Sequence, residues 1–305
     1  MNVYSAREFM SLSFLDTALV EGGILHERSR VIVSGGPGVG KSYLVTQIAW
    51  ESALGEDWLG IFGMKRPLRT MLLQTEVAAK PFQERLEVLG EAPAELYFCL
   101  GETFALARDV GELVKYIEGL GIEFVIFDPM YTIQEGDENT LEAAKATFRI
   151  IDKLRQDYNG TFLMVQHPNQ HGMIPSGRPN LTWLRGHTSW PGWVDTVFFM
   201  MPEHEGVRLY LLKARNRKSA LPKEPWTLAW GTERFFVPGD CSIGSDVAEI
   251  AEVIERLGGR ARQADVVDAL RESGHGKSWV YARLAELCEE GSLRKDGRYL
   301  VIEGG

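Results

Sequence analysis

An eight-residue segment in the first sixth of the chain holds the residues whose types and spacing point most directly to chemistry. It reads Gly35-Gly36-Pro37-Gly38-Val39-Gly40-Lys41-Ser42 and matches the pattern G-x-x-x-x-G-K-[ST] in full. In such a loop, backbone N–H groups surround phosphates, Lys41 reaches the β- and γ-phosphates, and the Ser42 hydroxyl binds Mg²⁺. The segment therefore predicts a site for a nucleoside triphosphate, ATP with Mg²⁺, and its full match disfavours a glycine-rich turn that binds nothing.

The residues on either side of this loop predict the elements that must position it. Arg30-Val31-Ile32-Val33-Ser34 is a β-branched run typical of a strand, and residues 43–54 have the apolar spacing of a helix. A second string, Gly274-His275-Gly276-Lys277-Ser278, ends like the first motif but has no strand before it. We interpret that second string as a turn and the start of a helix.

Two acidic residues end predicted strands at the edge where a nucleotide would lie. Asp128 follows the apolar run 124–127, which is the place of an aspartate that reaches the Mg²⁺ held by Ser42. Glu76 ends a strand predicted over 68–76, and parallel strands bring their carboxyl ends to one edge of a sheet. Glu76 then either orients the attacking water or stabilises the N-terminus of the next helix, and its position alone favours neither role.

Two further pairs of polar residues follow later predicted strands. Gln166 and His167 come directly after the strand predicted over 161–165, so they face the same edge and either contact a γ-phosphate or cap a loop. Lys213 and Arg215 follow a strand predicted from residue 207, with more cations close behind. They act on a neighbouring subunit's γ-phosphate if the subunits form a ring; otherwise they belong to a solvated basic turn.

The order of predicted elements sets the fold class. Strands alternate with helices predicted over residues 81–89, 110–120 and 140–158, with a polar loop at 130–139, which indicates an α/β fold with a mostly parallel sheet. Strands joined by tight turns over 194–230 finish that sheet. From residue 246 the pattern changes to three short helices (246–257, 263–272 and 278–289) and a hairpin that turns at Asp296-Gly297, which describe a winged helix-turn-helix. We predict an ATPase domain over 1–240 and a winged-helix domain over 246–305.

Composition limits the classes of partner, metal site and cellular location that the sequence allows. The 305 residues carry a formal net charge of −9, which argues against a surface that is basic throughout. Three widely spaced cysteines indicate neither a zinc site nor a disulfide framework. We expect a cytoplasmic protein that does not contact membranes, because the chain has neither a long apolar run nor a basic leader with an apolar core.

The first roughly 240 residues resemble the RecA-like hexameric ATPases of the plasmid RepA helicase type, which are related to the DnaB replicative helicases. Several ordered motifs carry this resemblance besides the phosphate loop. They are Asp128-Pro129 followed by Gly136-Asp137-Glu138-Asn139, then Gln166-His167, and then Arg185-Gly186-His187-Thr188-Ser189 with Val194-Asp195. The sequence departs from the family pattern at His187-Thr188, at the tryptophan-rich segment 189–193, and at Gln166-His167, where the family has paired histidines.

The resemblance implies roles for several residues. Glu76 takes the place of the catalytic glutamate, and Lys213 with Arg215 takes the place of a trans-acting K-x-R finger. It also implies a homo-oligomeric ring, a hexamer in this family, whose central loops hold single-stranded DNA. The expected function is an ATP-dependent DNA motor, a replicative-type helicase of a plasmid, phage or similar element. The alternatives are a DNA loader or recombination mediator switched by ATP, and a regulatory ATPase.

Candidate nucleic-acid contacts are the cations of two regions. They are His171 and Arg178 in the irregular segment 168–184 and Arg185 directly after it, and the alternative is a solvated surface loop. In the C-terminal part they are Lys277, before the candidate recognition helix 278–289, and Arg294, Lys295 and Arg298 of the hairpin. The C-terminal residues 246–305 contain nine Lys/Arg and twelve Asp/Glu, a balance of −3, so this module binds either DNA or protein.

Overall fold

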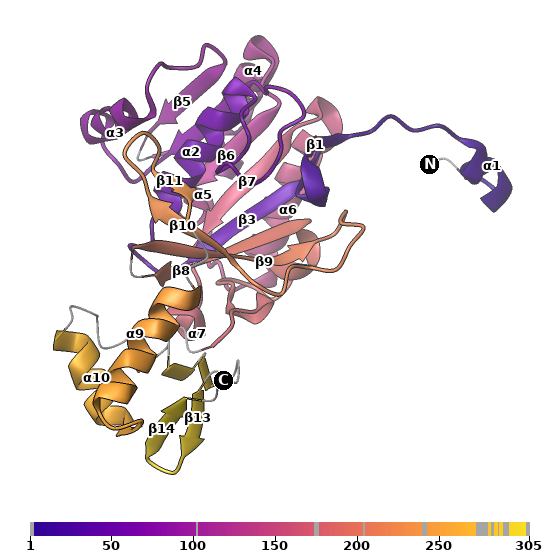
Figure 1. Ribbon diagram of the computed structural model, residues 1–305. Helices are drawn as coiled ribbons and strands as arrows, with labels where there is room; N and C mark the ends of the chain where they lie inside the picture. The colour runs from indigo at the N-terminus through magenta and orange to yellow at the C-terminus, as the bar shows by residue number, and fades with distance from the viewer. Residues whose placement is uncertain are drawn as a thin grey trace.

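A computed structural model describes residues 3–101, 103–173, 177–203, 205–239, 243–272, 280–281, 284–285, 287–288 and 293–302. Within them, a nine-stranded sheet with the order β11-β10-β9-β8-β3-β7-β6-β4-β5 forms the centre of the molecule (Figure 1). Its strands are β3 (Arg30–Gly35), β4 (Thr70–Gln74), β5 (Leu96–Leu100), β6 (Phe124–Asp128), β7 (Thr161–Gln166), β8 (Thr196–Glu203), β9 (Gly206–Ala214), β10 (Trp226–Trp230) and β11 (Phe236–Pro238).

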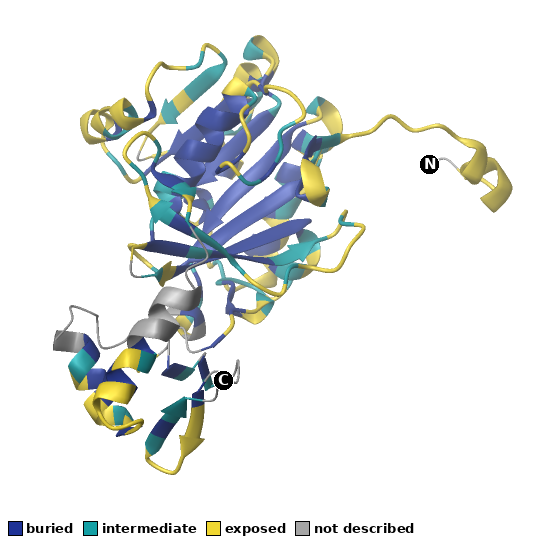
Figure 2. Ribbon diagram, viewed as in Figure 1, coloured by how far each residue is buried: buried dark blue, intermediate teal, exposed yellow. Residues whose placement is uncertain are grey.

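The six strands from β8 to β5 are parallel, and β9, β10 and β11 extend the sheet in antiparallel fashion. This arrangement confirms the predicted α/β class with a mostly parallel sheet. Every residue of β3, β4, β6 and β7 is buried, as expected for strands covered on both faces (Figure 2).

Helices cover both faces of the sheet. They are α2 (Lys41–Leu54), α3 (Ala79–Leu86), α4 (Leu106–Leu120) and α6 (Leu141–Tyr158). Because successive side chains of a strand point to opposite faces, Val31 and Val33 pack in one core with α2, whereas Ile32 packs in the other with α4 and α6. The chain ends α4 at Gly121 and α6 at Asn159, both in the left-handed conformation that closes helices.

Several elements differ from the sequence prediction. The edge strands β5 and β11 were not predicted, because each is short and is stabilised by pairing with a neighbour rather than by a periodic pattern of its own. The predicted polar loop at 130–139 begins with a helical turn, α5 (Met130–Ile133). The connection from β9 to β10 spans residues 215–225 and is therefore not a tight turn.

The segment before the sheet contains a short helix, α1 (Ala6–Ser11), and the strand pair β1 (Ala18–Val20) and β2 (Leu25–His26), with a 3-10 turn at Glu21–Gly23. Ser5 and Glu8 form a capping box that starts α1. The helix buries no residue and lies at the end of an extended arm in Figure 1.

The C-terminal part has a separate apolar core made only of residues between Ile250 and Leu300 (Figure 1). It contains α9 (Ile243–Arg256), α10 (Gln263–Glu272) and a three-stranded sheet of β12 (Arg260–Arg262), β14 (Tyr299–Ile302) and β13 (Leu293–Asp296). The predicted hairpin is present, and β12 is an addition to it. The predicted helix 278–289 lies partly outside the described residues, although Val280, Leu284 and Leu287 contribute to this core with helical spacing.

Candidate nucleotide site

Four neighbouring parallel strands end at the same edge of the sheet and bring the predicted site residues together. β3 leads into the phosphate loop, β6 ends with Asp128, and β7 ends with Gln166. The register pairs Gln74 of β4 with Asp128 and Ser34 of β3 with Gln166. This edge is therefore built from residues that lie up to about 130 positions apart in the sequence.

The phosphate loop has the backbone that its glycines predict. Gly38 and Gly40 have φ values of 74° and 97°, in the left-handed region that favours glycine. Gly40 is the residue that caps α2, so the helix begins at Lys41 and directs its free N–H groups toward the loop. The Lys41 ammonium donates hydrogen bonds of 2.8 Å to the carbonyl oxygens of Gly35 and Gly36. The loop is thus curled around its own lysine.

Ser42, Asp128 and Gln74 form a hydrogen-bonded chain beside this loop. The Ser42 hydroxyl donates to Asp128 Oδ1 at 3.2 Å, and Gln74 Nε2 donates to Asp128 Oδ2 at 2.8 Å. Gln74 Oε1 in turn accepts from the backbone N–H of Glu76 at 2.6 Å. Gln74 was not among the sequence-predicted residues; its register position opposite Asp128 is the signal that identifies it.

Glu76 contacts a second residue that sequence reasoning missed. The Tyr131 hydroxyl donates a hydrogen bond to Glu76 Oε1, and the Tyr131 ring lies 5.1 Å from the His167 ring, centroid to centroid. Tyr131 belongs to α5, the turn that replaces the predicted loop. Glu76, Tyr131 and His167 consequently form one cluster that extends the site from β4 to the end of β7.

Burial and charge set the protonation of the site. Burial raises the pKa of Asp128 to about 7, although the hydrogen bond from Ser42 favours its charged form. Burial lowers the pKa of Lys41 to about 8, against the attraction of Asp128 and Glu76. Burial and the Lys41 charge lower the pKa of His167, and the hydrogen bond to Glu76 raises the pKa of Tyr131 to about 12. Burial therefore favours the neutral forms of Asp128, Lys41 and His167.

The donor set fits a magnesium nucleotide. Ser42 and Asp128 offer adjacent hard oxygen ligands, and the described residues contain no cluster of three or more His, Cys, Asp and Glu side chains that could hold a metal alone. Mg²⁺ binds through one or two protein oxygens together with substrate phosphates and water, so two ligands suffice. Phosphate groups beside the loop would also balance the Lys41 charge.

Gln166 and Arg185 connect this edge to the acidic segment of α5–α6. Gln166 Nε2 donates to the Arg185 carbonyl oxygen at 2.8 Å, while its buried Oε1 has no hydrogen-bond partner among the described residues. The Arg185 guanidinium pairs with Glu138. Gln166 is therefore a structural link as well as a residue at the site edge.

Lys213 and Arg215 lie at the opposite edge of the sheet from the phosphate loop. β9 runs antiparallel to β8, so its last residue, Ala214, pairs with Thr196, which in turn pairs with Val31 near the start of β3. The strand from Arg30 to Gly35 spans about 16 Å at roughly 3.3 Å per residue. Lys213 and Arg215 are therefore out of reach of the nucleotide site in their own subunit.

These two cations hold a turn of their own subunit. Lys213 Nζ donates to the carbonyl oxygens of Pro191 and Val194 at 2.5 and 2.7 Å, and Arg215 donates to Gly192 O at 2.8 Å. Burial lowers the pKa of Lys213. Two of the three acceptors belong to α8 (Trp190–Trp193), the tryptophan-rich segment that departs from the family pattern, and Val194 directly follows it.

The structure describes most of the predicted nucleic-acid contacts, and two of them have partners within the subunit. Arg178 donates to Pro222 O at 3.0 Å, and Arg185 is paired at the nucleotide edge. The backbone of His171 lies in α7 (Gln170–Met173), but its side chain and the whole of Lys277 lie outside the described residues. The segment 168–185 is less irregular than predicted, since Asn169 N–H donates to Trp183 O at 2.7 Å. The remaining candidates, Arg294, Lys295 and Arg298, are exposed on the β13–β14 hairpin.

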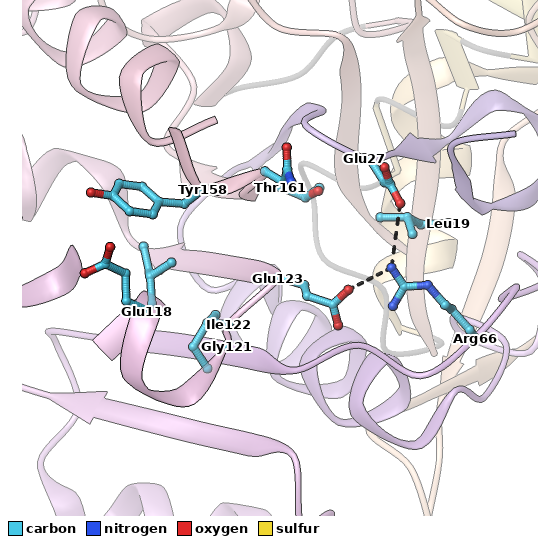
Figure 3. A pocket seen from close by; sticks show the side chains of 11 residues that line it. Leu19, Glu27, Arg66, Glu118, Gly121, Ile122, Glu123, Tyr158 and Thr161 are labelled. Atoms are coloured by element: carbon cyan, nitrogen blue, oxygen red, sulfur yellow. Dashed lines mark ion pairs between the residues drawn. The ribbon is translucent and has the colours of Figure 1, made fainter. Parts of the chain in front are cut away.

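A pocket of about 340 Å³ lies at the amino-terminal edge of the sheet, away from the phosphate loop (Figure 3). Thr161 begins β7 there, and Arg66 forms ion pairs with Glu27 and Glu123 at 3.8 and 2.7 Å. Because its arginine is already paired with two carboxylates, this pocket offers no free cation for a phosphate. It is not part of the nucleotide site.

The sheet order and the phosphate-loop edge define a P-loop ATPase with a RecA-like fold. A comparison with protein families matches residues 17–173, just over half of the chain, to the family described as AAA domain. The chain belongs to this AAA domain family. Among solved structures, a KaiC-like protein from the hyperthermophilic archaeon Pyrococcus horikoshii OT3 is similar, with a TM-score of 0.52 and 12% identity over 72% of this chain and 93% of that one. This likeness concerns the fold.

A search of curated protein sequences found no match. A search of the described residues for membrane-spanning helices found none that is long and apolar enough to cross a bilayer.

Proposed function

We propose that this protein is an ATP-hydrolysing motor that assembles as a ring and acts on DNA. One observation supports the proposal: the two groups of site residues predicted from the sequence lie at opposite edges of one sheet. The carboxyl edge of the sheet holds Glu76, Asp128 and Lys41, and the amino edge holds Lys213 and Arg215. Head-to-tail packing of identical subunits brings such complementary edges together, and it closes into a ring when the rotation between subunits permits.

Within one subunit, the residues divide the work of phosphoryl transfer to water. The loop N–H groups and Lys41 would bind the phosphates, and Ser42 with Asp128 would hold Mg²⁺, which when bound would neutralise charge on the phosphoryl oxygens. Glu76 accepts a proton from the attacking water and orients it. Gln74 fixes Asp128 and the backbone of Glu76 by hydrogen bonds, and Tyr131 holds the Glu76 carboxylate in place.

The neighbouring subunit would supply the remaining charge. Lys213 and Arg215 must leave the carbonyl oxygens of the α8 turn to contact a γ-phosphate across the interface. Nucleotide binding by one subunit would then compete with a contact inside the next. Through this competition, ATP hydrolysis would move α8 and the residues before it, the segment 177–194.

We assign helicase activity on DNA as the first choice within this class, on the resemblance to the plasmid RepA type. The C-terminal unit has two described helices, a hairpin, and Val280, Leu284 and Leu287 in its core. It is proposed to be a winged helix that binds DNA or protein. A DNA loader or recombination mediator is the second candidate. It is favoured by the internal pairing of Arg178 and Arg185, which leaves few free cations along the segment 168–185.

Mixing two inactive variants tests the shared site. Arg215→Ala keeps an intact Glu76, and Glu76→Gln keeps an intact finger, so each alone should show less than about 1% of wild-type ATP turnover. In a one-to-one mixture of exchanging subunits, about one quarter of the sites pair an intact acid with a neighbour's intact finger, and turnover should rise toward that fraction. Arg217→Ala removes a nearby cation and serves as the control; it should retain turnover.

If the mixture stays as inactive as its parents while subunit exchange is demonstrated by labelled chains, the trans assignment is wrong. Strand displacement on a forked DNA substrate, run with an unlabelled trap strand, then separates the two candidates. A helicase displaces the strand only with ATP, whereas a loader binds DNA in an ATP-dependent manner and releases no strand. Substitution of Arg294, Lys295 and Arg298 should spare unwinding and abolish sequence-specific binding if the C-terminal unit recognises a promoter.

A further inference from the structure

One face of the small C-terminal sheet gathers arginines from both of its outer strands. The sheet has the order β12-β14-β13, with β14 antiparallel to each neighbour. Arg260 of β12 and Arg294 of β13 both pair with Val301, and Arg262 of β12 pairs with Tyr299. Paired residues, and residues two apart on one strand, point to the same face of a sheet. These five side chains therefore share one face, which we call the arginine face.

The other face of this sheet packs on the helices. It bears Ala261, Leu293 and Leu300, which are at most 4% exposed and belong to one apolar core with residues of α9 and α10. Three residues of the predicted recognition helix 278–289 belong to the same core. Figure 1 shows α9 and α10 to one side of the β13–β14 hairpin. The arginine face is therefore turned away from the helices of this unit.

The arginine face is exposed and carries a positive charge. Arg260, Arg262 and Arg294 are all exposed. Within the described strands of this sheet, Asp296 is the one acidic residue; it lies on the same face and pairs with Arg260 at 2.7 Å. Three cations and one acid give this face a balance of +2, although the nine Lys/Arg and twelve Asp/Glu of residues 246–305 give −3. The charges of the unit are thus segregated, with cations gathered on one face of the sheet.

The spacing of these arginines suits a dense row of phosphates. Adjacent strands lie about 4.8 Å apart and alternate residues about 6.6 Å apart, so the three arginine positions lie within roughly 10 Å. The Arg260 guanidinium lies 4.4 Å from the centre of the half-buried Tyr299 ring, so this face offers cations rather than an open ring on which unpaired bases could stack. A nucleic-acid duplex carries one negative charge per about 1.7 Å of its axis, twice the density of one strand. A compact cluster of cations therefore gains more from a duplex than from a single strand.

Two neighbouring cations of β13 lie on opposite faces of the sheet. Arg294 pairs with Val301 on the arginine face, whereas Lys295 pairs with Leu300, whose side chain is fully buried in the core. Burial raises the pKa of the Cys288 thiol and the Lys295 charge lowers it, which agrees with a position of Lys295 on the helical side. Lys295 therefore provides a control of equal charge, one position away from Arg294.

We propose that the arginine face binds the phosphate backbone of duplex nucleic acid without reading its sequence. Contacts to phosphate position a protein on a duplex but carry no sequence information. The proposal deepens the assignment of the C-terminal unit in the proposed function, because it names a duplex as the partner and a surface other than the candidate recognition helix. The arginine face belongs to a unit with its own apolar core, so duplex binding should not require ATP.

The test compares substitutions on the two faces of the sheet. Fluorescence anisotropy of the full chain without nucleotide measures binding to two labelled duplexes of unrelated sequence, and to one of their single strands, over a range of salt concentrations. Arg262→Ala and Arg294→Ala should each weaken both duplexes about 5- to 10-fold near 0.1 M salt and reduce the slope of log K against log salt concentration by about 0.9. Lys295→Ala should leave the duplex Kd within about twofold of wild type. All three variants should keep wild-type ATP turnover, because none of these residues lies at the nucleotide edge.

Several results would overturn the proposal. Equal weakening by Lys295→Ala and Arg294→Ala would show that loss of charge, and not the face of the sheet, decides the affinity. The proposal also fails if the wild-type chain binds no duplex, if the single strand binds as tightly as the duplexes, or if the two duplexes differ by more than about tenfold. If duplexes bind but neither arginine affects them, this face serves another partner, such as an acidic protein. Loss of the proposed ATP turnover or ring, with duplex binding intact, would refute the motor and leave this assignment in place.

Discussion

The ion pair between Arg30 and Asp195 leads to a strong prediction about stability. Asp195 accepts hydrogen bonds from Arg30 Nε and a terminal guanidinium nitrogen at 3.0 and 3.1 Å, and from the Arg30 backbone N–H at 3.0 Å. Both side chains are only 9% exposed. The pair joins the start of β3, which leads to the phosphate loop, to the start of β8, and Asp195 also binds Arg215 at 2.9 Å.

Asp195→Ala should destabilise the fold by about 3 kcal/mol. Removal of one partner of a buried pair costs about 3–5 kcal/mol because the other charge remains in the interior without its partner. The lower end applies here, since Asp152 still contacts Arg30 at 3.1 Å and the Trp193 ring lies 4.8 Å from the guanidinium carbon. Asp195→Asn keeps an acceptor and should cost less, about 1.5–3 kcal/mol.

Urea unfolding followed by circular dichroism measures this loss, with Glu56→Ala as the matched control. Glu56 pairs with Arg234 at the same 2.9–3.0 Å separation but on the surface, so its removal should cost less than about 1 kcal/mol. A loss of less than about 1 kcal/mol for Asp195→Ala, or an equal loss for both variants, would refute the reasoning that burial makes this pair indispensable.

Three further predictions concern helix α2, the phosphate loop and the Mg²⁺ edge. Burial raises the pKa of Glu51 to about 7 from 4.5, so the native state binds this proton more tightly than the unfolded state, and the wild-type protein loses stability as the pH rises from about 4.5 to 7. The free energy of unfolding of Glu51→Gln minus that of wild type should therefore grow by about 2–3 kcal/mol between pH 5 and 8. An unchanged difference would contradict the assignment. Gly40→Ala should lower the melting temperature and the nucleotide affinity, because the backbone φ of Gly40 is 97° and the new Cβ would collide with Phe236. The control Gly111→Ala, which adds a Cβ in open space on α4, should stabilise the fold by about 0.5–1 kcal/mol. Gln74→Ala should lower kcat for ATP hydrolysis about 10-fold or more with a small change in KM, because it removes the hydrogen bonds that hold Asp128 and the Glu76 backbone. If the variant and the wild type have equal kcat values, Gln74 positions neither residue.

Much of the site was predictable because its parts obey local rules. The loop from Gly35 to Ser42 depends on contiguous backbone conformations, and only glycine adopts several of them readily. Asp128 and Gln166 end buried strands, and parallel strands share one functional edge. The strands themselves were predictable from apolar runs too short for helices. Edge strands such as β5 were missed because they depend on their neighbours for pairing.

The sequence by itself identified the phosphate-loop motif, two acids at the ends of predicted strands and two late cations, because each follows from a contiguous motif or from the end of an apolar run. Only the tertiary structure decided which other residues contact the phosphate loop and the two acids. Gln74 contacts Asp128 across 54 positions, Tyr131 contacts Glu76 across 55, and Trp230 lies beside Gly40 of the loop across 190. The tertiary structure also decided that Lys213 and Arg215 lie at the edge of the sheet opposite the phosphate loop, because the direction of a strand sets the edge at which its last residues lie. Contiguous motifs fix local backbone geometry, but contacts between distant residues depend on how whole elements pack.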